Sequence, residues 1–237
     1  LYDYQPSRGG YHAEKFLKGF SGYLTCDGFG GYNKLKDVIR CGCLAHMRRY
    51  WYDALPGKSK KTKEKTPAEI GFDYCNQLFE LEKEYADLDA ETRKVKRLET
   101  EPAIWKAYWS WLETLYPTGG SRLDKAVTYA KNQKPYMENY LLDGRCSISN
   151  NIADIIARPY AVGRINFLFH VTVKGARASS IIYSLVETAK LNNLNIYAYL
   201  ETVLLYMPDY KNEPEGIEEL MPWSDMIQQR CRIKSKS

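Results

Sequence analysis

The sequence contains no long hydrophobic run. No segment reaches the roughly 20 apolar residues that a membrane-spanning helix needs, and no basic stretch followed by an apolar one opens the chain. We therefore expect neither a membrane protein nor a secreted one. Internal repeats of roughly 20 to 50 residues are absent as well, so the chain lacks the pattern of a repeat protein.

Paired cysteines are also missing. The six cysteines are scattered through 237 residues and match no disulfide framework of a secreted domain. They are Cys26, Cys41, Cys43, Cys75, Cys146 and Cys231. This pattern favours a reducing compartment, and the cytoplasm is the expected location.

The charge is only mildly unbalanced. The net charge is +5 and the isoelectric point is about 8.7. Basic residues nevertheless gather at Arg48 and Arg49 and in residues 58–65, 93–97 and 230–236. Such clusters suit a polyanion, and they are also typical of solvated protein surfaces.

Strand and helix signals alternate in the first part of the chain. With 44% hydrophobic content, the chain can build one sizeable core, or a core with an inserted subdomain. Strands are predicted over residues 1–4, 22–27 and 38–44, and helices over residues 12–19 and 45–55. This alternation predicts an α/β layered domain.

The middle of the chain has a helical pattern. A lysine-rich linker at residues 58–67 precedes it, and apolar residues recur at helical spacing over residues 68–142, with an interruption near Pro135. The basic residues at 93–97 have two interpretations, contact with DNA or a solvated helix face. The aromatic residues of this segment are expected in its core, with stacking on an unpaired base as the alternative: Tyr108, Trp109 and Trp111.

Residues 149–169 combine several signals. Ser149 or Asn150 can cap a helix whose first turn contains Asp154. Arg158 lies four residues later, on the same helix face. A lone carboxylate in such a place is usually a solvated charge or a partner of the helix dipole.

The rest of the chain is predicted to be mainly helical. Pro159 is expected to disturb or end the preceding helix, and residues 167–169 form an aromatic run typical of a strand. Amphipathic helices are predicted over residues 176–191 and 196–207. An acidic tail from Pro208 and a basic end follow.

Together with a second acidic residue, Asp154 is a candidate metal ligand. Asp27 stands at the end of a predicted strand. A sheet that returns the chain to the same edge brings the two acids together, because the functional sites of α/β folds gather beyond the strand ends. Paired carboxylates there suit Mg²⁺ beside phosphate, and two ions about 3.5–4 Å apart stabilise both the attacking and the leaving oxygen of a phosphodiester.

Ordered sequence words along nearly the whole chain resemble one known family. They are Tyr2-Asp3-Tyr4-Gln5-Pro6-Ser7-Arg8, Phe16-Leu17 through Gly22-Tyr23-Leu24, Asp27-Gly28-Phe29 with Tyr32, Gly42-Cys43-Leu44-Ala45-His46-Met47-Arg48-Arg49, Ser149-Asn150-Asn151, Gly163-Arg164, Tyr183-Ser184-Leu185-Val186-Glu187-Thr188-Ala189-Lys190 and Leu220-Met221-Pro222-Trp223. Together they resemble the catalytic and C-terminal regions of an insertion sequence 66 family transposase, a bacterial D-D-E enzyme with a ribonuclease-H-like fold.

The resemblance implies roles for individual residues. Asp27 corresponds to the second acid of the triad, and Asp154 stands where the family has its catalytic Glu, so both are expected to hold Mg²⁺ or Mn²⁺. The family's first Asp lies upstream of this chain, which begins at Leu1 rather than Met, so we expect a processed product or a fragment. The expected DNA contacts are His46, Arg48, Arg49, Arg158 and Arg164, with an ion pair to Asp154 as the alternative for Arg158.

The resemblance also implies an organisation in four parts. The first part of an N-terminally truncated ribonuclease-H-like core covers residues 1–56, and a large all-α insertion covers residues 57–145. The second part of the core covers residues 146–192, and a C-terminal helical segment covers residues 193–237.

Three departures from the family pattern leave two functional hypotheses. The side chain of Asp154 is one methylene shorter than that of Glu, and a misplacement of a catalytic group by about 1 Å can cost on the order of a hundredfold in rate. In addition, Ile165 and Phe167 replace the Lys and Trp of the family's Gly-Arg-Lys-Asn-Trp word. The first hypothesis is a nucleoid-associated transposase that cleaves and joins DNA as a homo-oligomer on paired element ends. The second is an inactive remnant that binds DNA or pairs with an intact transposase.

Cys41, Cys43 and His46 suggest a zinc site. No second pair of ligands has zinc-finger spacing, however. A buried strand leading into a helix is therefore the favoured interpretation of these residues.

Overall fold

The computed structural model describes residues 1–57, 64–212 and 214–233. The chain divides into two compact units. The larger unit is Arg8–Asp154, and the smaller unit combines Leu1–Ser7 with Ile155–Ser237. Most of the predicted linker, residues 58–63, and the end of the predicted basic tail, residues 234–236, lie outside the described residues. The domain boundaries expected from the sequence stay predictions.

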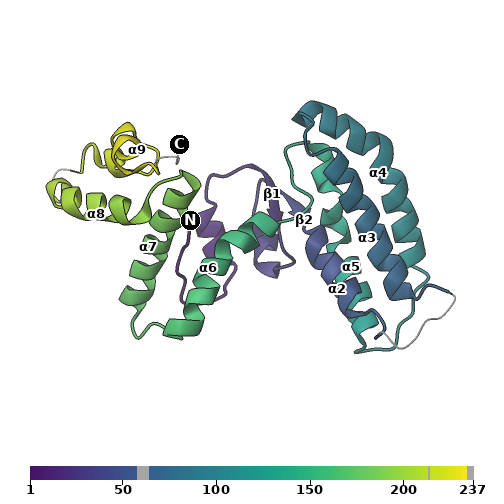
Figure 1. The fold of residues 1–237 in the computed structure, drawn as a ribbon. Coiled ribbons are helices and arrows are strands. Elements are labelled where there is room, and N and C mark those ends of the chain that lie inside the picture. Colours follow the sequence, from purple (N-terminus) through teal and green to yellow (C-terminus); the bar gives the residue numbers. More distant parts are fainter. Residues whose placement is uncertain (58–63, 213, 234–237) are drawn as a thin grey trace. The chain divides into compact units, whose positions relative to one another are not determined.

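A parallel pair of strands begins the larger unit. Strand β1 (Gly22–Cys26) pairs with strand β2 (Val38–Gly42), and Cys26 lies opposite Gly42. Helix α1 (Tyr11–Phe16) precedes β1, and the 3-10 helix η1 (Gly30–Lys34) lies between the strands. The two strands predicted over residues 22–27 and 38–44 are confirmed (Figure 1).

The strand predicted at residues 1–4 is wrong. These residues have no regular secondary structure. The Tyr2 N–H donates to Oγ of Ser184 at 2.8 Å, and the Tyr2 hydroxyl donates to the carbonyl of Ile156. Contacts with helices of the smaller unit therefore take the place of sheet pairing.

Four helices and a 3-10 turn follow the sheet in the larger unit, and we call them the helical body. They are α2 (Leu44–Asp53), α3 (Pro67–Glu84), α4 (Ala90–Leu112), α5 (Arg122–Met137) and η2 (Asn139–Leu142). Side-chain caps begin three of the helices, at Thr66, Asp89 and Ser121. Helix α5 continues through Pro135, so the predicted interruption falls two residues later, at the end of α5.

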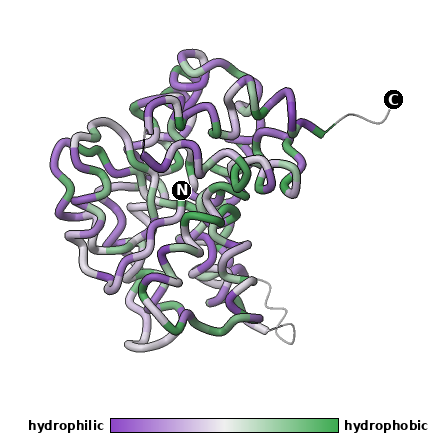
Figure 2. The backbone as a smooth tube through the Cα atoms, turned by 90° about the vertical axis from the view of Figure 1, so that its left-hand side faces the viewer, coloured by the Kyte–Doolittle hydropathy of each residue, from purple (hydrophilic) through white to green (hydrophobic). Residues whose placement is uncertain are grey.

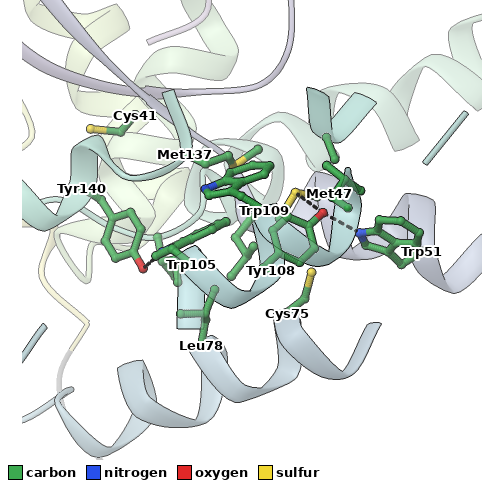
Figure 3. Close-up of a cluster of buried hydrophobic side chains, with 14 of the residues drawn as sticks. Cys41, Met47, Trp51, Cys75, Leu78, Trp105, Tyr108, Trp109, Met137 and Tyr140 are labelled. Atoms are coloured by element: carbon green, nitrogen blue, oxygen red, sulfur yellow. Dashed lines mark hydrogen bonds between the residues drawn. The ribbon is translucent and has the colours of Figure 1, made fainter. Parts of the chain in front are cut away.

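Aromatic side chains fill the core of the helical body (Figure 3). Nε1 of Trp51 donates to the hydroxyl of Tyr108 at 3.1 Å, and Nε1 of Trp105 donates to the hydroxyl of Tyr140 at 3.1 Å. Tyr108 and Trp109 are buried, and Trp111 packs against the same cluster. The predicted core role of these residues is confirmed, and burial removes Tyr108 and Trp109 from base stacking.

The basic residues of α4 do not form one DNA-facing surface. Arg97 is 1% exposed, and the guanidinium groups of Arg93 and Arg97 donate to backbone carbonyls of the helical body. Lys96 is exposed and pairs with Glu99 at 3.0 Å. Contact with DNA is therefore the wrong interpretation for both arginines.

The smaller unit is helical. Its helices are α6 (Asn151–Phe167, whose first residues belong to the larger unit), α7 (Val173–Leu191), α8 (Ile196–Tyr206) and α9 (Asp225–Cys231), with 3-10 turns η3 (Met207–Tyr210) and η4 (Ile217–Leu220). A second core joins α7, α8 and α9 through Ala189, Leu194, Tyr199, Ile227 and Cys231. The helices predicted over residues 176–191 and 196–207 are confirmed.

Helix α6 contradicts two local predictions. It continues through Pro159. No residue of α6 is buried, so the backbone group that Pro159 leaves unpaired belongs to an exposed helix. Residues 167–169 form no strand, because Leu168 has a φ of 57° and the Phe169 N–H donates to the carbonyl of Phe167 at 2.7 Å.

The described chain is thus a mixed α/β protein, mostly helical, with a small parallel sheet. Hydrophobic and hydrophilic residues alternate along the tube in Figure 2. Among residues 1–57, 64–212 and 214–233, no helix has the length and apolarity to cross a membrane. A ribonuclease-H-like arrangement of this unit stays a prediction.

Candidate active site

The parallel pairing of β1 and β2 creates the framework of the site. Because the strands run in the same direction, the residues that follow them lie at the same edge of the sheet. Asp27 follows β1, and Cys43 follows β2 and directly precedes α2. The Phe29 N–H donates to Oδ1 of Asp27 at 3.0 Å and holds the turn after β1.

The first turn of α2 brings His46 to Cys43 and Asp154. Burial opposes ionisation of the Cys43 thiol, yet hydrogen bonds from the His46 side chain and the Asn150 N–H outweigh it and lower the pKa of Cys43. The hydrogen bond with Cys43 raises the pKa of His46 against the effect of burial, and the charge of Asp154 raises it further. This part of the sheet edge is therefore a coupled group of ionisable side chains.

Helix α5 closes the other side of the sheet edge. A Cβ atom built on Gly28 would lie 3.0 Å from the Tyr129 ring and 3.1 Å from Nε2 of Gln133, so α5 packs directly against the turn that carries Asp27. Burial raises the pKa of Tyr129, and the charges of Cys43 and Asp27 raise it further. Tyr129 thus packs against the turn that follows β1.

Four buried polar atoms at this edge have no hydrogen-bond partner in the described part of the chain. They are Nδ1 of His46, Oδ1 of Asn150, the hydroxyl of Tyr129 and Oε1 of Gln133. A buried polar atom without a partner costs about 1–3 kcal/mol, so a group of them marks a place where a polar ligand or water is needed. We call these four side chains together with Asp27, Cys43 and Asp154 the sheet-edge site.

The predicted cap by Asn150 is not formed. Asn150 directly precedes α6, but its Oδ1 atom is one of the unpartnered ones. Its backbone carbonyl instead accepts the N–H groups of Ala153 and Asp154, at 2.9 and 3.2 Å. The amide side chain is left for another role at the site.

The two acids suit a hard divalent cation. Hydrogen bonding from Phe29 occupies only one carboxylate oxygen of Asp27, and Asp154 is exposed. No three His, Cys, Asp or Glu side chains gather as a metal site among the described residues. Mg²⁺ is commonly held by one or two carboxylates and completed by substrate phosphate and water, and the assignment of Asp27 and Asp154 as its protein ligands stays a prediction.

A polar cleft of about 670 Å³ lies next to the sheet-edge site, between α2 and α3. Arg48, Arg49 and Asn151 of α6 are among the residues that line it. Nε of Arg48 donates to Oδ1 of Asn76 at 2.6 Å, and its guanidinium lies 4.3 Å from the centre of the Phe72 ring. Arg48 is thus held in place, whereas Arg49 is exposed.

The predicted site residues fall in both units. Asp27, His46, Arg48, Arg49 and Asp154 belong to the larger one. Arg158 and Arg164 are exposed residues of α6 in the smaller one. The charge of Asp154 raises the pKa of His46, and the roles of all these residues stay predictions.

Sequence reasoning missed Tyr129 and Gln133. They come from the helical body, far along the chain from Asp27, and their spacing of one helical turn is that of any amphipathic helix. For Cys43 the sequence indicates only a zinc ligand or a buried residue, and the contact of Cys43 with His46 is local. The spacing of Cys43 and His46 across a helix start is the one signal that pointed to the pair.

Acidic and basic side chains at the edge of a parallel sheet define a candidate site for a phosphate-containing ligand. Comparison with protein families agrees with the order of the sequence words. The family described as Transposase IS66 family matches residues 1–178, and the IS66 C-terminal element matches residues 184–223. The chain belongs to the IS66 transposase family.

Three relatives from Sinorhizobium fredii are similar to almost the whole chain. Uncharacterized protein y4qI is 30% identical over 236 residues, y4hP is 26% identical over 239 residues and y4jD is 28% identical over 235 residues. Each alignment covers 94% of this chain but only 42%, 43% and 45% of the respective relative. The chain therefore spans less than half the length of these relatives. No solved structure matches it significantly.

Proposed function

We propose that this chain carries a catalytic region of a DNA transposase, which cleaves a phosphodiester at element ends and transfers the freed 3′-hydroxyl to target DNA. The observation that supports this proposal best is the sheet-edge site. Its two acids, its histidine and its unpartnered polar atoms lie within the segment that the transposase family matches. The ribonuclease-H-like arrangement of the core is part of the same proposal.

Asp27 and Asp154 are the proposed ligands of Mg²⁺, for which Mn²⁺ can substitute. A bound divalent ion would polarise the phosphate and lower the pKa of a water molecule. The short side chain of Asp154 requires its backbone to lie closer to the ion than that of a Glu would.

Basic side chains are the proposed DNA contacts. The hydrogen bond with Cys43 and the charge of Asp154 raise the pKa of His46 and favour its cationic form, and Arg48 and Arg49 add positive charge along the polar cleft. Guanidinium groups match phosphate oxygens in a bidentate fashion. Arg158 and Arg164 of α6 are exposed and are also proposed to bind DNA phosphates. Action as a homo-oligomer on paired ends is part of the proposal.

A catalytically inactive remnant is the second candidate. The aspartate at position 154, where the family resemblance expects a glutamate, favours it, because a shorter ligand at a metal site weakens the alignment of the reacting groups. Such a protein would keep DNA binding and lose cleavage.

A cleavage assay on element-end DNA with Mg²⁺ tests the proposal. Asp27→Ala should abolish Mg²⁺-dependent cleavage, whereas Asp154→Glu should retain or increase it. Asp73→Ala is the matched control, because Asp73 is a partly exposed residue of α3 paired with Lys65 and should leave the rate unchanged. Equal cleavage by Asp27→Ala and the parent chain would overturn the assignment of Asp27.

A DNA-binding measurement separates the two candidates. Fluorescence anisotropy with the same DNA should show binding in either case. If the parent chain and Asp154→Glu, each extended by the upstream segment that carries the family's first Asp, both bind but neither cleaves, the protein is a remnant.

A further inference from the structure

A short segment, residues 140–150, begins within η2 and carries the chain from the helical body to the sheet-edge site. At the sheet end, the Leu44 N–H donates to the carbonyl of Ile148 at 3.0 Å, and the Asn150 N–H donates to Sγ of Cys43 at 3.4 Å. Helix α6 begins directly afterwards, with Asp154 in its first turn. The position of Asp154 therefore depends on how residues 140–150 are held.

Arg97 of α4 holds the other end of this segment. Its Nη1 donates to the carbonyls of Tyr140 and Asp143, both at 3.2 Å, and its Nη2 donates to the carbonyl of Cys146 at 2.9 Å. Its Nε and Nη2 donate to the two carboxylate oxygens of Glu82 at 2.6 and 2.5 Å. A guanidinium group has five N–H donors, and each of them is used.

The buried hydrogen bonds of Arg97 require an arginine at this position. Arg97 is 1% exposed and the Glu82 side chain is 12% exposed. Glu82 neutralises the buried charge, and the three carbonyls orient the guanidinium. A lysine has three donors on one atom and cannot reproduce a planar fork that spans three carbonyls and a carboxylate.

A neighbouring arginine and a glycine bring the same segment close to α4. Nη1 of Arg93 donates to the carbonyl of Gly144 at 3.1 Å. A Cβ atom at Gly144 would lie 1.8 Å from the carbonyl oxygen of Ala90, so only glycine permits this approach. The segment is thus anchored from Tyr140 to Cys146 by α4 and from Ile148 to Asn150 by the sheet edge.

We propose that Arg97 is a positioning residue for Asp154: by holding three carbonyls between Tyr140 and Cys146, it fixes the segment that sets Asp154 at the sheet edge. This inference rests on the proposed function, in which Asp154 is a metal ligand. In this proposal the helical body contributes directly to the site, because its residue Arg97 fixes the segment that leads to Asp154.

Three variants of the full chain test the inference. Arg97→Lys keeps the charge and removes the fork. Leu112→Ala opens the buried core at the C-terminal end of the same helix and leaves Arg97 in place. It is the control for lost stability. Each variant is measured at a urea concentration that gives it the same free energy of unfolding. Lys96→Ala removes an exposed ion pair of α4 and should behave as the parent chain.

Hydrogen exchange of the backbone amides is the first readout. Exchange at Leu44 and at residues 150–154 should be at least about tenfold faster in Arg97→Lys than in Leu112→Ala. Equal exchange in these two variants would overturn the inference, because Arg97 would then act through global stability alone.

Binding of Mn²⁺, followed by electron paramagnetic resonance of the free ion, is the second readout. Arg97→Lys should weaken binding by about tenfold relative to Leu112→Ala, as expected when a residue behind a metal ligand is lost. Equal affinity in the two variants would also overturn the inference. If Asp154→Ala binds Mn²⁺ as well as the parent chain, the proposed metal site is wrong, and the exchange result alone decides whether Arg97 positions the segment.

Discussion

Replacing Glu101 with glutamine should remove most of the pH dependence of the stability of the helical body. Glu101 is 0% exposed. The Tyr140 hydroxyl donates to Oε2 of Glu101, and its Oε1 has no partner in the described part of the chain. Burial and the charge of Glu82 raise the pKa of Glu101 to about 8, and they outweigh the hydrogen bond from Tyr140, which lowers it.

The direction of the effect follows from proton binding. The ordinary pKa of this carboxyl group is 4.5, and the folded value is about 8. Between these pH values the folded chain keeps a proton that the unfolded chain releases. The contribution of the Glu101 carboxyl group to the free energy of unfolding is therefore complete below pH 4.5 and is lost as the pH rises toward 8. At about 1.4 kcal/mol per pH unit, an interval of this width corresponds to several kcal/mol.

Glutamine reproduces the protonated carboxyl. Its carbonyl can accept from Tyr140, and its amide can donate to Glu82, whose carboxylate lies within hydrogen-bonding reach of Glu101. We expect Glu101→Gln to change the free energy of unfolding by less than about 1 kcal/mol near pH 5 and to increase it by several kcal/mol near pH 8.5.

Urea unfolding followed by tryptophan fluorescence measures this effect. Four of the five tryptophans lie in or against the core of the helical body, so the signal reports on the right part of the chain. Glu99→Gln, an exposed change on the same helix, is the control and should follow the parent at every pH. Parallel pH profiles for Glu101→Gln and the parent would refute the reasoning, because Glu101 would then not be the group that keeps the proton.

Two further predictions concern the sheet-edge site and the segment that leads to it. Gly144→Ala should destabilise the chain by about 1–3 kcal/mol, because the added methyl group collides with the Ala90 carbonyl; an unchanged midpoint in urea unfolding would contradict this. Tyr129→Phe removes a buried hydroxyl without a partner among the described residues, so it should leave stability equal or higher by up to about 1 kcal/mol while slowing Mg²⁺-dependent cleavage. A slower cleavage rate with lower stability would instead indicate a packing role for the hydroxyl.

Local signals predicted much of the fold. Strands β1 and β2 and helices α2, α7 and α8 follow from alternation and helical periodicity, because each of them has one face that must be buried. The strand expected at residues 167–169 was wrong because a positive φ at Leu168 turns the chain. The helix end expected at Pro159 was wrong because an exposed helix tolerates the loss of one hydrogen bond.

The site was predictable only in part. Asp27 stands at a strand end, which sequence patterning identified, and the family words pointed to His46 and Asp154. Tyr129 and Gln133 gave no signal, since their meaning depends on α5 packing against Gly28. The sequence signal at Arg97 was misleading, because a basic residue in a charged stretch is usually exposed to solvent. The three carbonyls that accept hydrogen bonds from Arg97 come from distant residues and are not visible in the sequence.

The sequence by itself determined the family, the positions of the two acids and the helical character of the middle of the chain, because these depend on residue order and on short-range periodicity. Only the tertiary structure decided that the helical body supplies Tyr129 and Gln133 to the sheet edge and anchors the segment before Asp154 through Arg97. Burial and hydrogen bonding between distant segments determine those roles, and no local pattern in the chain records them.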